Sequence, residues 1–201
     1  MNKFKIKNGK LKKYIGLTKI IIPDGITFID HYAFADRKEL TSIIIPNSVT
    51  SIGECAFQNC KGLTKIIIPD SVTYIGEVAF KGCENLTSIT IPDGVVSIKE
   101  HTFSECYELT SITIPDGVVS IDGYAFYGCK KLTSIKIPDG VTSIGDFAFL
   151  DCEKLTSIKI PNSVTSIGDC AFFGCENLEL IIPDSVISIG NNAFTGCKKI
   201  N

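Results

Sequence analysis

The stretch from Leu40 to Gly62 reads LTSIIIPNSVTSIGECAFQNCKG, and it contains the phrase that decides the fold. This phrase fills the chain almost from end to end, in eight copies of about 23 residues. The prolines show the period, because the first seven are 23 residues apart and the last follows after 22 (Pro23, Pro46, Pro69, Pro92, Pro115, Pro138, Pro161 and Pro183). A fixed period of roughly 20–29 residues, with Leu and Ile at set positions, predicts a solenoid whose coils bury their apolar faces against each other.

The length of 201 residues and the unbroken repeat predict a single domain. We expect an N-terminal capping hairpin at residues 1–16 and a solenoid at residues 17–201. Hydrophobic residues make up 44% of the chain, but no apolar run is long enough to predict a membrane span. The first residues alternate lysine with apolar side chains and lack the apolar core of a signal peptide, which predicts either a cytoplasmic chain or one whose leader has been removed.

Charge is distributed unevenly along the chain. Residues 1–19 contain seven lysines and no acid, so 13 of the 20 basic residues are left to oppose all 22 acidic ones, a balance of −9. A nucleic-acid groove requires basic residues along its length, and we therefore expect no nucleic-acid partner. The lysine-rich end is interpreted first as a solvated cap.

Each copy begins with a strand. In the second copy, Ile43 and Ile45 alternate with Ile44, so the first two are predicted to point inward with Leu40, and Ile44 to point outward. Pro46 fits the end of this strand because proline cannot donate a hydrogen bond to a neighbouring strand.

The rest of the copy closes the coil. Asp or Asn followed by Gly or Ser predicts a turn in which the short acidic or amide side chain accepts from a backbone amide. Val49 and Ile52 form a second inward pair, and Ala56 and Phe57 are predicted to lie on a short helical or 3₁₀ segment. The chain then turns at Asn59, where a positive φ is expected, and at its glycine equivalents (Gly82, Gly128, Gly174 and Gly196). Strand and helical segment together predict an α/β repeat solenoid.

Stacked copies should align their identical residues in ladders, from Leu17 to Leu178 and from Phe34 to Phe194. Residues 3–14 predict a hairpin around Asn8-Gly9, because this pair is a strong signal for a two-residue turn. We expect this hairpin to cover the first coil with three inward side chains (Phe4, Ile6 and Leu11).

The phrase LTSIxIPDxVTSIGxxAFxGC resembles the BspA-like leucine-rich repeats, also called the Treponema pallidum type, over about residues 17–200. The segments IP-D/N, SIG, AF and GC stand at the same positions in each copy. This resemblance implies a right-handed solenoid with the S-I-x-I-P strands on one face. It also implies a cell-surface or secreted adhesin that binds host, matrix or microbial proteins, although the sequence shows neither an export signal nor a wall anchor.

The nine cysteines follow the repeat. Seven stand in one column at the coil spacing, which is unlike the spacing of metal-binding cysteine pairs (Cys60, Cys83, Cys106, Cys129, Cys152, Cys175 and Cys197). Cys55 and Cys170 stand in another column. Because a ladder gives each thiol two equal neighbours and the total is odd, we expect buried, reduced thiols that act as small hydrophobic groups.

Other chemical groups do not form a recognisable site. The acidic and amide residues after the prolines form a column that a calcium row could use, but turn formation explains them without a metal (Asp24, Asn47, Asp70, Asp93, Asp116, Asp139, Asn162 and Asp184). His31 and His101 stand about three coils apart, and each serine of the strands is a repeat position. No nucleophile is paired with a base, so the sequence predicts no enzyme, no cofactor and no metal.

Two groups of residues vary within the repeat and are candidates for protein binding. The first is an outward apolar stripe on the strands, with two lysines near it (Ile21, Ile44, Ile67, Lys19 and Lys65). The second gathers around the repeated Phe positions of the later copies (Tyr124, Tyr127, Phe147, Leu150 and Phe173). Exposed apolar patches mark interfaces, but packing within a thick loop layer is the alternative explanation for each group.

The leading hypothesis is a rigid scaffold that binds a protein ligand as an adhesin. The alternative is a structural protein that associates with itself, in which one of the two groups closes a symmetric dimer. A small hydrolase or metal enzyme is the third class, and it lacks a site.

Overall fold

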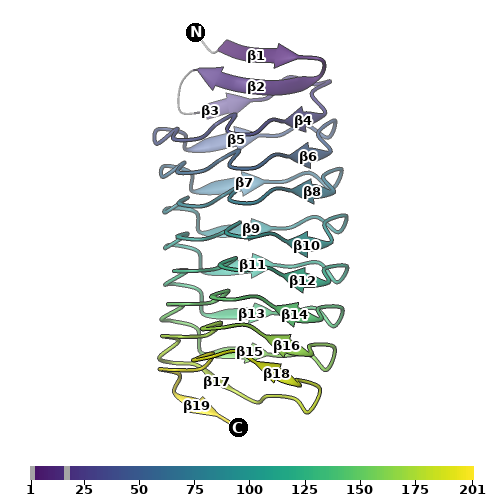
Figure 1. The fold of residues 1–201 in the computed structure, drawn as a ribbon. Coiled ribbons are helices and arrows are strands. Elements are labelled where there is room, and N and C mark those ends of the chain that lie inside the picture. The colour runs from purple at the N-terminus through teal and green to yellow at the C-terminus, as the bar shows by residue number, and fades with distance from the viewer. Residues whose placement is uncertain (1–2, 16–18) are drawn as a thin grey trace.

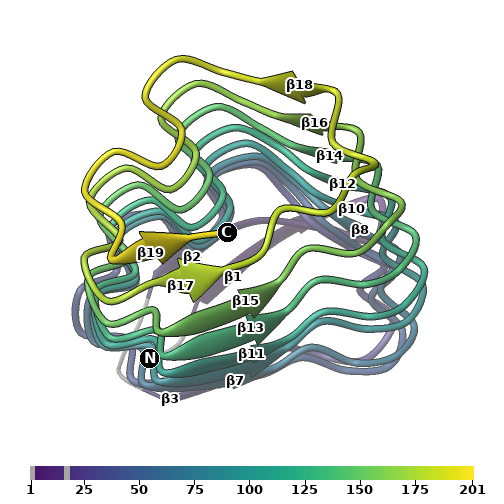
Figure 2. The ribbon, with the colours of Figure 1, turned by 90° about the horizontal axis from the view of Figure 1, so that it is seen from below.

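The computed structural model describes residues 3–15 and 19–201, which form a column of stacked coils (Figure 1). A two-stranded antiparallel hairpin, β1 (Lys3–Lys7) and β2 (Lys10–Ile15), lies at the N-terminal end of the column. Each following coil contributes one strand to each of two faces, and turns fill its third side, as the view along the column shows (Figure 2).

The first face carries the strands that begin each copy. They are β3 (Lys19–Ile21), β5 (Ser42–Ile44), β7 (Lys65–Ile67), β9 (Ser88–Thr90), β11 (Ser111–Thr113), β13 (Ser134–Lys136), β15 (Ser157–Lys159), β17 (Glu179–Leu180) and β19 (Lys199–Ile200). Neighbouring strands pair in parallel at the repeat spacing, and the face consists of two sheets, β3 to β11 and β13 to β19.

The second face carries the shorter strands. They are β4 (Phe28–Ile29), β6 (Ser51–Ile52), β8 (Tyr74–Ile75), β10 (Ser97–Ile98), β12 (Ser120–Ile121), β14 (Ser143–Ile144), β16 (Ser166–Ile167) and β18 (Ser188–Ile189). They also pair in parallel, in one sheet from β10 to β18 and another in which β4, β6 and β8 follow the hairpin. The first three strands thereby continue the sheet that the hairpin begins.

The core lies between the two faces and the turns. The predicted inward residues of the second coil are buried, as Ile43, Val49 and Ile52 show, while Ile44 points to solvent. The alternation read from the sequence is therefore confirmed. The predicted leucine ladder is buried from Leu40 to Leu178, and its first member, Leu17, lies outside the described residues.

The phenylalanine column forms one continuous stack through the core. From Phe34 to Phe194, successive ring centroids lie 5.0–5.6 Å apart, and the ring planes differ by no more than 13°. Tyr14 of β2 extends the stack toward the hairpin at 5.6 Å from Phe34, and Phe4 follows at 5.1 Å from Tyr14. The hairpin therefore covers the first coil with aromatic rings as well as with hydrogen bonds.

One prediction for the hairpin was wrong. Leu11 is fully buried and Phe4 packs against the core, but Ile6 is 46% exposed. The order β1-β2-β4 makes β1 the outermost strand, so Ile6 has no further strand to pack against among the described residues. Tyr14, which the sequence analysis did not assign to the core, is buried instead.

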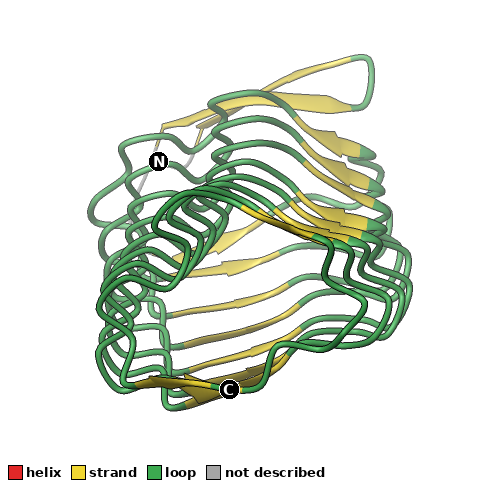
Figure 3. Ribbon diagram, turned by 60° about the horizontal axis from the view of Figure 1, so that its bottom comes forward, coloured by secondary structure: helices red, strands yellow, loops and turns green. Residues whose placement is uncertain are grey.

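The α/β class is not confirmed, because no helix is present in residues 3–15 and 19–201 (Figure 3). The predicted helical segment around Phe57 is a run of turns. The amides of Cys55, Phe57 and Asn59 donate to carbonyls of the next coil at 3.0, 2.8 and 2.7 Å. Those of Gln58 and Cys60 close turns within their own coil. The fold is a β-solenoid of about eight coils.

Two columns of positive φ explain why these turns do not become a helix. The predicted column contains glycine and several other residues (Asp36, Asn59, Gly82, Glu105, Gly128, Asp151, Gly174 and Gly196). A second column, two positions before each Phe, has φ between 50° and 60° although none of its members is glycine (Tyr32, Cys55, Val78, His101, Tyr124, Phe147, Cys170 and Asn192). Such a φ costs about 1–2 kcal/mol for an L-residue, and the hydrogen bonds between coils offset this cost.

Candidate protein-binding surfaces

The predicted isoleucine stripe is exposed on the first face. Ile21, Ile44 and Ile67 retain 69%, 59% and 69% of their accessible surface. They are aligned partners in the parallel pairing of β3, β5 and β7, so their side chains lie one above another. A hollow of about 240 Å³ adjoins the stripe between β7 and β9, which pair in parallel at Lys65 and Ser88.

Opposite charges border the stripe on its two sides. Lys19 and Lys65 begin their strands two residues before the isoleucines, and both are exposed. Asp24 and Asp70, also exposed, follow the isoleucines by three residues. Within the described ranges, none of these four charged side chains forms an ion pair with the rest of the chain, so their charges remain available to a partner.

Farther along the column the stripe changes character. The same outward position holds Thr90 and Thr113 in the next two coils, followed by Lys136 and Lys159. The Lys136 ammonium reaches the Asp116 carboxylate of the preceding coil at 3.1 Å, which shows that the column of acids lies beside the outward column. The repeat therefore accepts apolar, polar or charged side chains here.

Ile181 belongs to the same outward column and was missed by the sequence analysis. It is 70% exposed and lies in the last copy, where the repeat has lost one residue. The 22-residue spacing between Pro161 and Pro183 was the signal that could have identified it, because the shorter copy shifts the alignment after Leu178.

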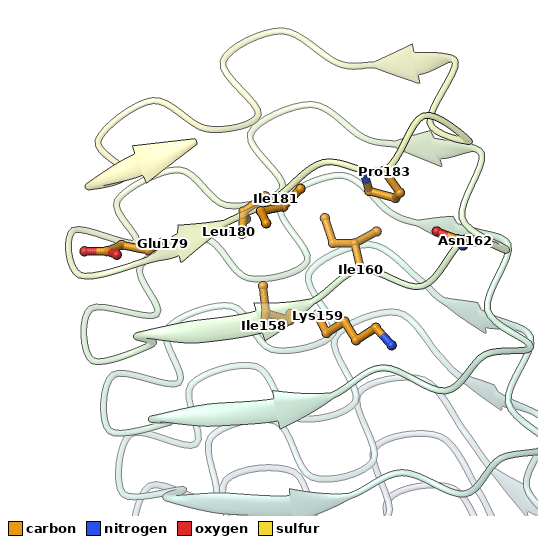
Figure 4. A pocket seen from close by; sticks show the side chains of 8 residues that line it. All are labelled: Ile158, Lys159, Ile160, Asn162, Glu179, Leu180, Ile181 and Pro183. Carbon is orange, nitrogen blue, oxygen red and sulfur yellow. The ribbon is translucent and has the colours of Figure 1, made fainter. Parts of the chain in front are cut away.

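A hollow of about 440 Å³ opens beside Ile181, between β15 and β17 (Figure 4). These strands pair at Ser157 and Glu179, after which Leu180 pairs onward with β19. Figure 4 shows Ile160 and Ile181 at the gap between the strands, while the polar ends of Lys159 and Glu179 extend away from it. Ile160 stays buried at this gap, whereas Ile181 is exposed like the other isoleucines of the outward column.

The second candidate group lies in the turn layer and is more deeply packed than the stripe. Tyr124, Tyr127, Phe147 and Leu150 are half-buried, and Phe173 is exposed at 37%. Tyr124 stacks on Phe147 at 4.6 Å and meets Tyr127 edge to face at 6.1 Å. These contacts favour packing within the turn layer as the explanation for Tyr124, Tyr127 and Phe147. Phe173 keeps the largest free surface of the group.

The thiols fit the predicted role as small buried groups. All nine cysteines are free, and seven of them are buried. Each thiol of the main column donates to the carbonyl of a phenylalanine in the preceding coil, as Cys60 does to Phe34 at 3.1 Å and Cys129 does to Phe103 at 3.3 Å. Burial raises the pKa of Cys60 to about 12, so the group stays a neutral thiol.

The two histidines make separate contacts. His31 Nδ1 accepts from the Glu54 amide at 3.1 Å, and His101 stacks on Tyr124 at 4.5 Å. Burial, assisted by the nearby Lys81, lowers the pKa of His101. Among the described residues, no group of three or more His, Cys, Asp or Glu side chains is arranged to hold a metal.

The acidic column differs from the prediction in one respect. In the described part of the chain, no acidic or amide side chain of this column accepts a hydrogen bond from a backbone amide. The next residue makes the contacts instead, since Ser48 Oγ accepts from the Gly25 amide at 3.2 Å and donates to the Ile26 carbonyl at 2.8 Å. The turn is closed by the backbone, through the Val49 amide and the Pro46 carbonyl at 3.1 Å. The carboxylates are therefore free to face solvent.

Several solved structures share this architecture. A leucine-rich cell surface protein from Faecalibacterium prausnitzii is 30% identical with a TM-score of 0.64, and the match covers 100% of this chain and 74% of that one. The leucine-rich repeat protein of T. pallidum is 28% identical with a TM-score of 0.70, and coverage is 97% and 86%. A leucine-rich repeat protein from Bacteroides ovatus is 31% identical with a TM-score of 0.67, and coverage is 98% and 55%.

No curated protein is similar enough to this chain to count as a match. None of the described residues forms a helix long and apolar enough to cross a membrane. The BspA-type leucine-rich repeat region matches in two overlapping segments, residues 5–132 and 73–201. Because these segments extend over nearly all of the sequence, the chain belongs to the BspA-type leucine-rich repeat family.

Proposed function

We propose that this protein is a scaffold for protein recognition, of the adhesin type, and that it binds its ligand through the first three coils of the first face. One observation carries the proposal: the isoleucine stripe is not required by the fold. Thr90 and Thr113 occupy the same position in neighbouring coils with the same strand pairing. Apolar side chains that the repeat does not need, and that solvent contacts, are typical of an interface.

The stack of coils suits this role because it is rigid. Each coil is bonded to its neighbours on both faces and through the turn layer, so the outward side chains are held at fixed spacing before a ligand arrives. A preformed surface binds with a smaller entropy cost than one that must order itself on contact. The similarity to a leucine-rich cell surface protein supports an adhesin-type role.

Replacing the whole stripe tests the proposal. The triple variant Ile21→Thr, Ile44→Thr and Ile67→Thr should melt within a few degrees of the unmodified chain, since threonine suits an exposed strand position. It should lose most of its capture by immobilised fibronectin and laminin, which serve as matrix probes. The substitutions remove apolar contact area, and each Å² of such area contributes about 25 cal/mol to binding.

The second face offers a matched control. Tyr74, Val96 and Val119 are exposed apolar residues there, and their joint replacement by threonine changes a similar area away from the stripe. Capture should survive this control. If the unmodified chain captures neither probe, the adhesin-type role is wrong. If capture is strong but indifferent to the stripe, the binding surface lies elsewhere, and Phe173 becomes the next residue to replace.

A further inference from the structure

The charges beside the stripe form a pattern that distinguishes its two sides. Across coil three the order is Lys65, Ile67 and Asp70, which places a cation on one side of the isoleucine and a carboxylate on the other. Coil one repeats the pattern with Lys19 and Asp24. Coil two, between them, has the half-buried Ser42 and the exposed Asn47 around Ile44, so it is neutral on both sides.

This pattern is complementary to itself under one kind of two-fold symmetry. When the two-fold axis runs above the stripe and parallel to the solenoid axis, each isoleucine meets its own counterpart. The same operation places Lys65 opposite Asp70 of the second copy, and Lys19 opposite Asp24 of the second copy. Four ion pairs then surround an apolar centre, an arrangement in which charge sets the orientation and apolar contact supplies affinity.

The other symmetric arrangement of the two faces is unfavourable. A two-fold axis that crosses the stripe at Ile44, perpendicular to the solenoid axis, places Lys19 opposite Lys65 of the second copy. It also brings the carboxylates of Asp24 and Asp70 together. Like charges in opposition disfavour this antiparallel arrangement, so the charge pattern selects between the two dimers.

We propose that the first face binds a second copy of this chain, with the two solenoids side by side and running in the same direction. This inference rests on the proposed function, because it uses the same binding surface: the second copy occupies the stripe when no foreign ligand is bound. The isoleucines of coils one to three and the threonines of coils four and five form the contact. Lys136 and Lys159 each face their own counterpart, and the pairing of Lys136 with Asp116 offsets only one of these two cations, so the contact ends before coil six.

The size of the surface predicts a weak dimer. Five coils at about 4.8 Å each give a length of roughly 24 Å, and the six residues from Lys to Asp span about 20 Å. The resulting area of roughly 480 Å² per copy is well under the ~800 Å² of a stable interface. Association should therefore require high micromolar concentration in solution, and it becomes effective where many copies are held close together.

Charge reversal tests both the occupant and the orientation. Sedimentation equilibrium is measured from low micromolar to millimolar protein for Lys65→Glu, for Asp70→Lys and for their equimolar mixture. Each variant alone places like charges opposite each other, and its self-association should weaken by about tenfold. In the mixture, the carboxylate introduced by Lys65→Glu meets the ammonium introduced by Asp70→Lys. The native pair of Lys65 and Asp70 forms on the opposite side, so association should recover.

Two further variants serve as controls. Lys38→Glu makes the same change in net charge as Lys65→Glu, but at an exposed position in the turn layer, and it should leave association unchanged. The double variant Lys136→Thr and Lys159→Thr removes the repulsion along the axis and should strengthen association by extending the contact. Circular dichroism confirms that each variant is folded.

Three results would overturn the inference: a monomer at every concentration, stronger association of Lys65→Glu alone, or a mixture that does not recover. The proposed function is tested separately, by capture on the matrix probes. If the chain stays monomeric while the triple threonine variant still loses capture by the matrix probes, the stripe binds a foreign protein and only the second copy is ruled out.

Discussion

The two ends of the column place the same repeat residue in different surroundings. Ile29 of the first coil is fully buried, whereas Ile189 of the last copy is 49% exposed. Ile29 lies between Leu11 of the hairpin and Ile52 of the next coil, while Ile189 pairs only with Ile167 among the described residues. Each coil is therefore buried by its neighbours more than by its own residues, which is the expected behaviour of a repeat array.

The largest effect should come from an aromatic residue in the middle of the stack. Phe103 lies 5.6 Å from the rings on both sides, so Phe103→Ala leaves a cavity that should lower the free energy of unfolding by about 3–5 kcal/mol. Phe194→Ala should cost clearly less, because in the described part of the chain Phe194 stacks on one ring, that of Phe172. Urea unfolding of the two variants tests this order. Equal losses would show that each coil is stabilised mainly from within.

An intermediate effect is expected where the hairpin meets the first coil. Lys12 of β2 forms an ion pair with Asp30, whose side chain is largely buried. Asp30→Asn breaks this pair and should cost about 1–2 kcal/mol at neutral pH, between the values for exposed and buried pairs. Thermal unfolding measures the loss, with Asp93→Asn at an exposed position as the control.

The pH dependence of this effect has a definite sign. Burial acts to raise the pKa of Asp30, but the hydrogen bonds and the charge of Lys12 outweigh it and hold the pKa below its ordinary value. A lowered pKa in the folded state stabilises the fold above the unfolded-state value of 3.8. This stabilisation is lost as the pH falls through the lowered pKa. The difference between Asp30→Asn and the unmodified chain should therefore shrink below about pH 4 and remain constant above about pH 6. A difference that grows on acidification would contradict the ion pair.

The smallest effect is predicted at the exposed isoleucine of the last copy. Ile189→Thr should change the free energy of unfolding by about 0.5 kcal/mol or less, because the side chain is half in solvent and threonine suits a strand. Ile167→Thr, one coil earlier, places a hydroxyl in the core and should cost several times more. Melting curves of these two variants test the difference. Equal losses of stability would show that the last coil is packed as tightly as the coil before it.

The sequence predicted those features of the fold that depend on side chains repeated in every copy. The period, the inward columns and the phenylalanine ladder follow from identical side chains at identical positions, as Phe57 and Phe80 illustrate. The exposed isoleucine stripe was also predicted, because Ile44 alternates with two buried neighbours. These features depend on side-chain chemistry that each copy repeats.

Other features lacked such a signal. Tyr32, Cys55 and Val78 share a positive φ but no chemical property, so no residue type marked that column. The Ala-Phe pairs beside it predicted a helix, but the same residues suit a turn equally well, so they could not distinguish the two. The charges beside the stripe were visible in the sequence, but their position on opposite sides of one surface depended on the strand register.

The turn layer also affects how the column can grow. Alternate amides of this layer, such as that of Phe57, point toward the following coil, whereas the amides of Thr50 and Gly53 point toward the preceding one. Their peptide dipoles therefore oppose each other, unlike those of an α-helix, which add along the axis. Adding a coil contributes little to a dipole along the column. A solenoid of this design can lengthen by whole repeats without building up opposite partial charges at its two ends.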